Sequence, residues 1–396
     1  MRLSQILTVF FVFMISSALQ AQLSLSAIPI ATVNNNFRSL ALGNAVVSLS
    51  GKYGDYHINP AGVGLTNSIQ VYGGRDYPDG YGSGRTFLIL NYGFKKSGFN
   101  LSLQKYQWEE QLTLVGSYKK LRGRFNSDEI FMNASYSYSF NPYLRAGIGI
   151  NYIHTTQSSG SIYSQALTDD LKFFTVDLGF LYQGSSYKIS MGSITPNAGF
   201  SISDFGKSQS YYSSGYGEPL PTTLRLGAGL TFESDKKVWN QHLIGSSVLF
   251  NTSKFTGRKE LKGNEMDGYY YEAMPAFKAL FNSWGTFEWN NGQQIKNYSL
   301  PEQIWLHSGI ELTFLETFSL RFGRENAANE EEWLSYRSVG FGVDLYYISL
   351  DYTSIKLDSG EPNLYYNFYS GNHWQLTGRF PLKGKKPNTI LTQILK

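Results

Sequence analysis

The sequence predicts an all-β protein: a transmembrane antiparallel β-barrel of about 14 strands with an N-terminal hatch inside the lumen. Two observations favour this fold class. Segments of alternating apolar and polar residues follow one another along most of the chain. Among 396 residues there are 29 Tyr and 27 Phe, while only 16% of residues are charged. Strands place alternate side chains on opposite faces, and lipid-exposed barrels carry aromatic girdles at both interfaces. One strand face is therefore expected to contact lipid.

Residues 1–21 have the layout of a secretory signal peptide. Arg2 supplies the positive charge, residues 6–19 form the apolar core, and the segment Ala18–Ala21 offers a cleavage site before Gln22. This core is too short to span a bilayer of roughly 30 Å, although an uncleaved anchor is the alternative. No later apolar run reaches the length of a transmembrane helix, so a membrane protein with this sequence must cross as a closed barrel.

Residues 22–66 are expected to form the hatch. Small residues crowd the segment Phe37–Leu65, and it ends on the turn Asn59-Pro60-Ala61-Gly62. In such a turn Pro fixes φ, Asn bonds to nearby backbone, and Gly can adopt positive φ. A barrel of fourteen strands is wider than the roughly eight-stranded size that side chains alone can fill. We expect the hatch to occupy this space, held by Asn59, Pro60, Ala61 and Gly62.

Residues 67–382 are expected to form the barrel wall. In Leu144–Tyr152 and Leu224–Phe232, apolar residues share one face, while Gly, Arg, Asn and Thr share the other. A soluble sandwich with one wet face is the alternative. Fifteen candidate strands conflict with the even number that such barrels have, so one candidate before residue 141 is expected to be wrong. The candidates are 68–74, 85–94, 98–108, 111–121, 129–140, 143–155, 173–183, 186–195, 222–232, 240–250, 303–314, 317–324, 337–345, 346–353 and 372–381.

Short turns and long loops are expected to alternate along the wall, the long loops lying outside the cell. The longest loop, 251–302, contains Tyr269-Tyr270-Tyr271 and a segment, 272–284, whose pattern predicts a short helix. We interpret it as a folded external cap. The other long loops are predicted at 156–172, 196–221, 325–336 and 354–371. Residues 383–396 are expected to form a periplasmic tail, either a frayed end or a docking element.

Five charged residues on the polar strand faces are candidates for the lumen, where they can pair with one another or meet an anionic head group such as a fatty acid carboxylate. Pairing that fills the lumen is the favoured role for each. They are Arg145, Lys188, Arg225, Arg321 and Asp344.

The sequence carries no motif of an enzyme, metal site or cofactor site. It has no cysteine, none of its five histidines belongs to an HExxH pair, and no GxSxG, P-loop or Rossmann motif is present. We therefore expect no catalytic residues, no metal and no cofactor. A Ser–His pair can still assemble across strands, which leaves an outer-membrane hydrolase as an alternative. A net charge of +4 does not indicate binding to nucleic acid.

Four segments resemble a known family. Arg38–Ala45, Gly51–Asp55 and Asn59–Gly62 together resemble the N-terminal signature of FadL/OmpP1-type outer-membrane proteins, and equally of their PorV-type relatives. Pro221–Gly227 resembles a strand opening of the PorV branch. The resemblance implies a fourteen-stranded barrel in the bacterial outer membrane, plugged by a hatch that contains the turn Asn59–Gly62. The loop 251–302 and the tail depart from the family pattern.

The resemblance leaves two functions open. One is the uptake of hydrophobic small molecules, such as long-chain fatty acids, by a FadL-like transporter. The other is a PorV-like accessory role in a protein secretion or assembly complex, such as the type IX secretion system. The expected partners are outer-membrane lipid, a hydrophobic ligand, and secretion or assembly proteins.

Overall fold

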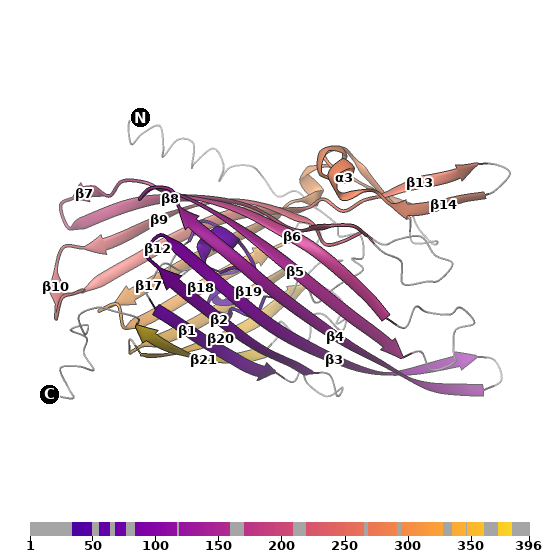
Figure 1. The fold of residues 1–396 in the computed structure, drawn as a ribbon, viewed down its shortest axis with the longest axis horizontal. Coiled ribbons are helices and arrows are strands. Elements are labelled where there is room, and N and C mark those ends of the chain that lie inside the picture. Colours follow the sequence, from indigo (N-terminus) through magenta and orange to yellow (C-terminus); the bar gives the residue numbers. More distant parts are fainter. Residues whose placement is uncertain are drawn as a thin grey trace.

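Fourteen long strands among the described residues close into one antiparallel barrel (Figure 1). The computed structural model describes residues 34–49, 55–63, 68–76, 84–116, 119–158, 170–208, 219–264, 268–290, 295–327, 335–345, 347–359 and 371–381. Each strand pairs with its neighbours along the chain, β1 pairs with β21, and the short β7 lies at the edge of β8. The barrel strands are β1 (Ser68–Asp76), β2 (Gly84–Phe94), β3 (Ser97–Gly116), β4 (Lys119–Ser139), β5 (Leu144–Ser158), β6 (Asp170–Gln183), β8 (Gly192–Gly206), β9 (Thr223–Ser234), β12 (Ile244–Phe255), β17 (Trp305–Phe314), β18 (Phe318–Asn326), β19 (Ser335–Asp344), β20 (Ile348–Ser359) and β21 (Gly371–Pro381).

The predicted number of strands is confirmed, and the surplus candidate is 111–121. That segment is the end of β3 and the beginning of β4, which stay paired as far as Gly116 and Lys119. The segment 111–121 therefore spans the paired ends of two consecutive strands and is not a strand of its own.

The predicted strand 186–195 and loop 196–221 are wrong. The chain instead forms β7 (Tyr187–Ile189) and then β8, which continues to Gly206 and pairs with β9 over most of its length. Ile194, Ala198, Phe200 and Ile202 keep the apolar alternation, but Pro196 lacks a backbone N–H and therefore argued against a central strand here. A register shift between β6 and β8, opposite Asp204, interrupts the pairing.

The connection between β12 and β17 is folded, and it contains the short helix predicted within 272–284, as α3 (Ala276–Asn282). Together with α3, the hairpin β13–β14 lies beyond one end of the barrel (Figure 1). We call this end, which carries the longer connections, the outer end. The remaining elements are β13 (Lys259–Asn264), β14 (Gly268–Ala273), β15 (Phe287–Asn290), β16 (Ile295–Tyr298) and η4 (Pro301–Gln303), with β10 (Lys237–Val238) and β11 (Gln241–His242) in an inner turn.

Arg258 links three parts of this connection to one another. Its guanidinium donates to the carbonyl oxygens of Gly257 (2.9 Å) and Ser283 (3.2 Å) and to the side chain of Gln303. Burial lowers the pKa of Arg258 to about 10. The guanidinium remains charged at neutral pH, so these hydrogen bonds are charge-assisted.

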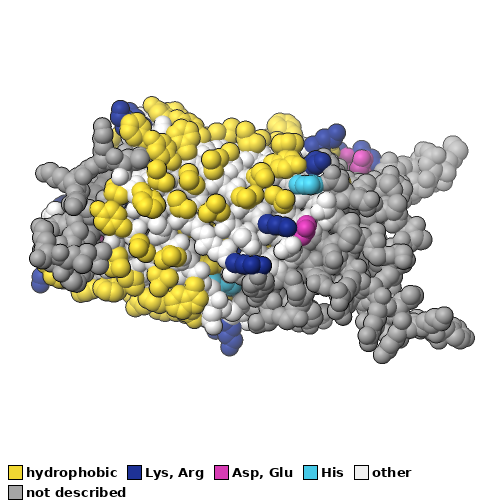
Figure 2. Space-filling view, turned by 60° about the horizontal axis from the view of Figure 1, so that its bottom comes forward, with side chains coloured by type: hydrophobic (Ala, Val, Ile, Leu, Met, Phe, Trp, Pro, Cys, Tyr) yellow, Lys and Arg dark blue, Asp and Glu magenta, His cyan; other side chains and the backbone are white. Residues whose placement is uncertain are grey.

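The two faces of the wall have the predicted polarity. The side chains of Ile150 and Leu320 are 55% and 53% exposed on the outside, whereas Asn151 and Arg321 are 1% and 4% exposed on the inside. Hydrophobic side chains form a broad band over the strands that face the viewer in Figure 2. Separately, no helix within the described residues is long and apolar enough to cross a membrane.

Residues 34–49 and 55–63 lie inside the barrel, and we call them together the inner segment. All of these residues except Asn36 are buried. The helix α2 (Phe37–Ala41) contacts β18–β21, and η3 (Pro60–Gly62) contacts β4–β6. The inner segment therefore reaches opposite sides of the lumen, and its role as a hatch that gates the lumen stays a prediction. The predicted signal peptide, residues 22–33 and the tail 383–396 lie outside the described residues.

Candidate functional site: the inner segment and the lumen

The turn Asn59–Gly62 packs against glycines of the wall. The Asn59 side chain accepts a hydrogen bond from the Ala61 amide (3.0 Å) and donates to the carbonyl oxygens of Val47 (2.8 Å) and Phe180 (3.2 Å). A Cβ atom built at Gly147 would lie 2.3 Å from the Ala61 nitrogen, a distance that no side chain tolerates. The turn and the wall thus approach at backbone distance, which only glycine permits. Gly62 is not among the described glycines with positive φ. The expectation that the turn uses the positive φ open to glycine at this position is therefore wrong.

Buried charges join the inner segment to the opposite wall. Arg38 on α2 makes two hydrogen bonds to Glu311 on β17, at 2.7 and 3.0 Å. Arg321 on β18 donates to the same carboxylate at 2.6 Å and to Asp351 on β20 at 2.5 Å. Two guanidiniums and two carboxylates balance here, as a buried charge network requires.

A second polar group holds the middle of the inner segment. Asn34 donates to Asp55 (2.8 Å) and to Asn44 (2.9 Å), and Asn44 donates to Glu325 on β18 (2.9 Å). These contacts connect residues 34–49 to residues 55–63 and to the wall.

Ser253 on β12 and His307 on β17 form a Ser–His pair across strands, which the hydrolase alternative requires. Ser253 Oγ lies 2.7 Å from His307 Nε2, while His307 Nδ1 lies 3.0 Å from the Gly43 carbonyl oxygen and 3.5 Å from Glu325. Because the Gly43 carbonyl oxygen can only accept, Nδ1 carries a proton, and Ser253 Oγ and His307 Nε2 share a hydrogen bond. Ser253 and His307 are 7% and 5% exposed, so a substrate cannot reach Ser253 while the inner segment is in place. The pair thus ties β12 and β17 to Gly43 of the inner segment.

Sequence reasoning missed a polar cluster at the register shift between β6 and β8. Asp177 accepts hydrogen bonds from the Asp204 amide (2.7 Å) and from Asn151 (3.0 Å), and Asp204 has φ of +57°. Arg225 donates to the neighbouring Ser203 (2.6 Å). The alternation places Asp177 on the same face as Gly179, which could have identified it as a lumen residue, but the position of Asp204 depends on the register shift.

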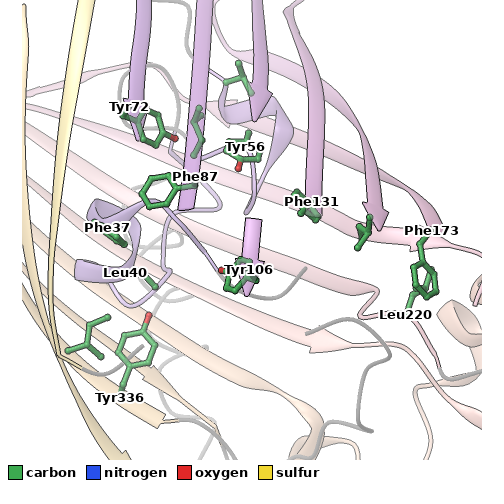
Figure 3. Close-up of a cluster of buried hydrophobic side chains, with 14 of the residues drawn as sticks. Phe37, Leu40, Tyr56, Tyr72, Phe87, Tyr106, Phe131, Phe173, Leu220 and Tyr336 are labelled. Carbon is green, nitrogen blue, oxygen red and sulfur yellow. The ribbon is translucent and has the colours of Figure 1, made fainter. Parts of the chain in front are cut away.

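An apolar layer lines the lumen next to this polar cluster, further toward the outer end. Phe131, Ile153 and Phe173 lie directly opposite one another on β4, β5 and β6, and all three are at most 2% exposed. Phe87 on β2 belongs to the same cluster. Rings from several strands and from the inner segment gather there, as Figure 3 shows. The buried members include Phe37, Leu40, Tyr56, Val63, Tyr72, Ile89, Tyr106, Tyr336 and Ile355.

The five charged candidates do not form one site. Arg225 and Arg321 belong to the two networks above, and Arg145 is half-buried with its Nε donating to Ser139 (3.0 Å). Asp344 pairs with Arg379 at 3.0 Å, not with Arg321. Lys188 is not a lumen residue: it lies on β7, its side chain is 76% exposed, and it pairs with Asp235 at 2.6 Å. The short strand β7 places Lys188 in an inner turn. This turn was missed because one strand was predicted over 186–195.

Comparisons with known proteins find similar solved structures. No protein-family model matches the chain, and no curated protein matches it. A FadL homologue from Pseudomonas aeruginosa is 10% identical, with 89% of this chain and 99% of that chain covered and a TM-score of 0.41. The toluene transporter TbuX from Ralstonia pickettii is 10% identical, with 86% and 95% covered and a TM-score of 0.41.

The toluene transporter TodX from Pseudomonas putida is 11% identical, with 92% and 98% covered and a TM-score of 0.43. Similarity at this level concerns the barrel and not what passes through it.

Proposed function

We propose that this chain is an outer-membrane barrel that admits hydrophobic small molecules, long-chain fatty acids among them. The observation that carries the proposal is the apolar layer in the lumen. A porin-type barrel has a polar, water-filled interior, and ligand sites for hydrophobic molecules are lined mainly by apolar and aromatic side chains. Here Phe87, Phe131, Ile153 and Phe173 belong to a buried apolar cluster that also includes inner-segment residues, and they would contact a ligand once the inner segment has moved.

The inner segment occupies the route from this layer to the inner end of the barrel. Its Asn59–Gly62 turn contacts Gly147 and Gly179, six residues along β5 and β6 from Ile153 and Phe173 respectively. A molecule held at the apolar layer therefore passes inward only when the inner segment moves. This movement breaks the buried contacts of Arg38, Asn44 and Asn59 with the wall, and it also separates inner-segment side chains such as Leu42 and Val47 from Leu249 on β12.

Replacing Phe173 with Ala is expected to weaken the binding of a hydrophobic probe about tenfold, because a ring contact of about 1.5 kcal/mol is lost. Binding of a fluorescent long-chain fatty acid to the refolded barrel measures this effect, and binding of toluene measures whether the lining also accepts a small aromatic ring. The matched control is Phe174→Ala, since Phe174 is the next residue on the strand and is 67% exposed on the lipid side. Equal binding by both variants would show that the apolar layer is structural packing only.

The second candidate is the accessory role in protein secretion or assembly. The connection between β12 and β17 favours it, because Phe277 and Phe281 of α3 are 69% and 63% exposed and lie beyond the barrel. Purification from native membranes separates the two candidates. A stoichiometric protein partner that is lost from Phe277→Ser/Phe281→Ser, with probe binding unchanged, favours the accessory role.

A further inference from the structure

Lys254, near the outer end of β12, is a lysine buried beneath the connection that joins β12 to β17. It is only 3% exposed. Its Nζ donates to the Phe255 carbonyl oxygen at 3.2 Å and lies 5.3 Å from the centre of the ring of Trp284, the second residue after α3. Among the described residues, no carboxylate lies within ion-pair distance of Nζ. A cation in this place therefore lacks the acidic partner that a buried charge normally requires.

The acids of the connection whose side chains are described do not supply that partner. Glu260 on β13 pairs with two lysines of the connection. Glu272 on β14 is exposed, and Glu302 on η4 accepts a hydrogen bond from the hydroxyl of the serine three residues before it, at 2.6 Å. The charged group that does act on Lys254 is the guanidinium of Arg258, which repels a second positive charge.

Lys254 is held close to neutrality by these surroundings. Burial, and to a smaller extent the positive charge of Arg258, lower the pKa of Lys254 from 10.5 to about 7. The residue is the last but one in β12 and is covered by the connection, so it lies outside the lipid-facing part of that strand. The Trp284 ring attracts the charged amine but only partly offsets the loss of water.

A cavity lies between α3 and the outer rim of the barrel. Leu220, Thr222 and Gly257 line it from the barrel side, and Met274, Ala276 and Ala279 line it from the connection. Leu220 also belongs to the buried cluster that contains Phe173. The cavity thus adjoins the apolar layer on the side of the outer end, and α3 covers it.

We propose that α3 is a pH-dependent gate over this cavity, with Lys254 as its sensor. When α3 lifts, Lys254 meets water and carries its charge at no cost. Beneath the docked helix the neutral amine is favoured, so protonation promotes the open gate and deprotonation the closed one. The gate would control access from the outer end to the apolar layer, so the inference rests on the proposed function, but closure of the gate is measured without a ligand.

The sign and the size of the effect follow from proton linkage. Between about pH 7 and the ordinary lysine value of 10.5, the docked state binds fewer protons than the lifted one, so docking strengthens as the pH rises through this window. From pH 7 to pH 9 the docking equilibrium is expected to shift about fiftyfold toward the closed gate.

The test uses single cysteines in the full-length barrel, since the chain has none of its own. Ala279→Cys on α3 and Leu220→Cys on the barrel side replace residues that are 1% and 3% exposed, whereas Phe281→Cys replaces a residue of α3 that is 63% exposed. The labelling rate of Phe281→Cys by a methanethiosulfonate reagent, divided by that of either buried cysteine, gives the protection at each pH. Protection of both buried cysteines is expected to rise about fiftyfold from pH 7 to pH 9.

Adding Lys254→Met is expected to remove this rise and to give high protection already at pH 7. Lys254→Gln replaces it if heat-modifiable migration on gels shows that the methionine variant does not fold. The matched control is Lys207→Met, which removes the same charge from an exposed position at the outer end and is expected to keep the rise.

Protection that does not change with pH, or a rise that persists without Lys254, would overturn the inference. A rise for Ala279→Cys but not for Leu220→Cys would overturn it too, because α3 would then not close the cavity. Protection that rises as expected in a barrel that binds no hydrophobic probe would remove the proposed function and leave the gate.

Discussion

Replacing Glu311 with Ala is expected to lower the free energy of unfolding by about 3–5 kcal/mol, the usual cost of removing one partner from a buried ion pair. The carboxylate of Glu311 accepts hydrogen bonds from both Arg38 and Arg321. Its loss leaves the inner segment without its ionic contact to β17 and leaves a buried guanidinium without full compensation. Equilibrium unfolding in urea measures the stability, and conductance in planar bilayers measures whether the lumen opens.

The matched control is Asp235→Asn. Asp235 pairs with Lys188 at 2.6 Å, but both side chains are more than half exposed. An exposed ion pair contributes about 0–1 kcal/mol, so this variant is expected to remain as stable and as closed as the wild type. If Glu311→Ala were as stable and as closed as Asp235→Asn, the buried network would not hold the inner segment.

Replacing Ile150 with Arg is expected to cost about 2–4 kcal/mol, because a charged side chain would be placed against the middle of the hydrocarbon layer. Ile150 is 55% exposed in the centre of the outward face of β5. Refolding into lipid vesicles followed by urea titration measures this cost.

Two controls test separately whether the cost depends on depth in the membrane and on the strand face that carries the substitution. Tyr182→Arg lies on the same outward face at the end of β6, where a charge is expected to cost less than about 1 kcal/mol. Thr231→Asn changes a lumen residue that accepts a hydrogen bond from Asn197 at 3.1 Å, and a small cost is expected there too. Similar costs for all three variants would contradict the assignment of the lipid face.

The barrel itself could be predicted from the sequence because its signal is local. Segments such as Leu144–Tyr152 alternate with period two. In the structure their apolar residues lie on the outside of the barrel and their polar residues on the inside, as expected. The limits of β8 were not predicted, because Pro196 argued against a central strand and the register shift near Asp204 depends on pairing with β6.

The polar contacts in the lumen could be predicted only by residue type. Arg321 was identified as a lumen cation, but its partners Glu311 and Asp351 lie on β17 and β20. Which acid meets which arginine depends on the register and curvature of the closed barrel, which no single segment encodes. Lys188 was wrongly placed in the lumen because a wall strand was predicted at 186–195. In the structure Lys188 is exposed in an inner turn.

The movement of the inner segment is tested most directly by locking it to the wall. The chain has no cysteine, so an introduced pair is the sole disulfide. A Cβ atom built at Gly309 lies 3.1 Å from the Leu42 Cβ, just below the usual range of about 3.5–4.5 Å for a disulfide. The same Cβ would lie 2.6 Å from the Leu42 carbonyl oxygen, so the variant Leu42→Cys/Gly309→Cys requires the backbone of the inner segment to shift away from β17, and gel migration shows whether the bond forms.

Uptake of a radiolabelled long-chain fatty acid into vesicles is then compared before and after reduction, with each single cysteine variant as a control. We predict that the oxidised protein does not transport the fatty acid and that reduction restores transport to the level of the single variants. Transport by the fully cross-linked protein at the same rate as the reduced protein would contradict the proposal that hydrophobic molecules pass only when the inner segment moves.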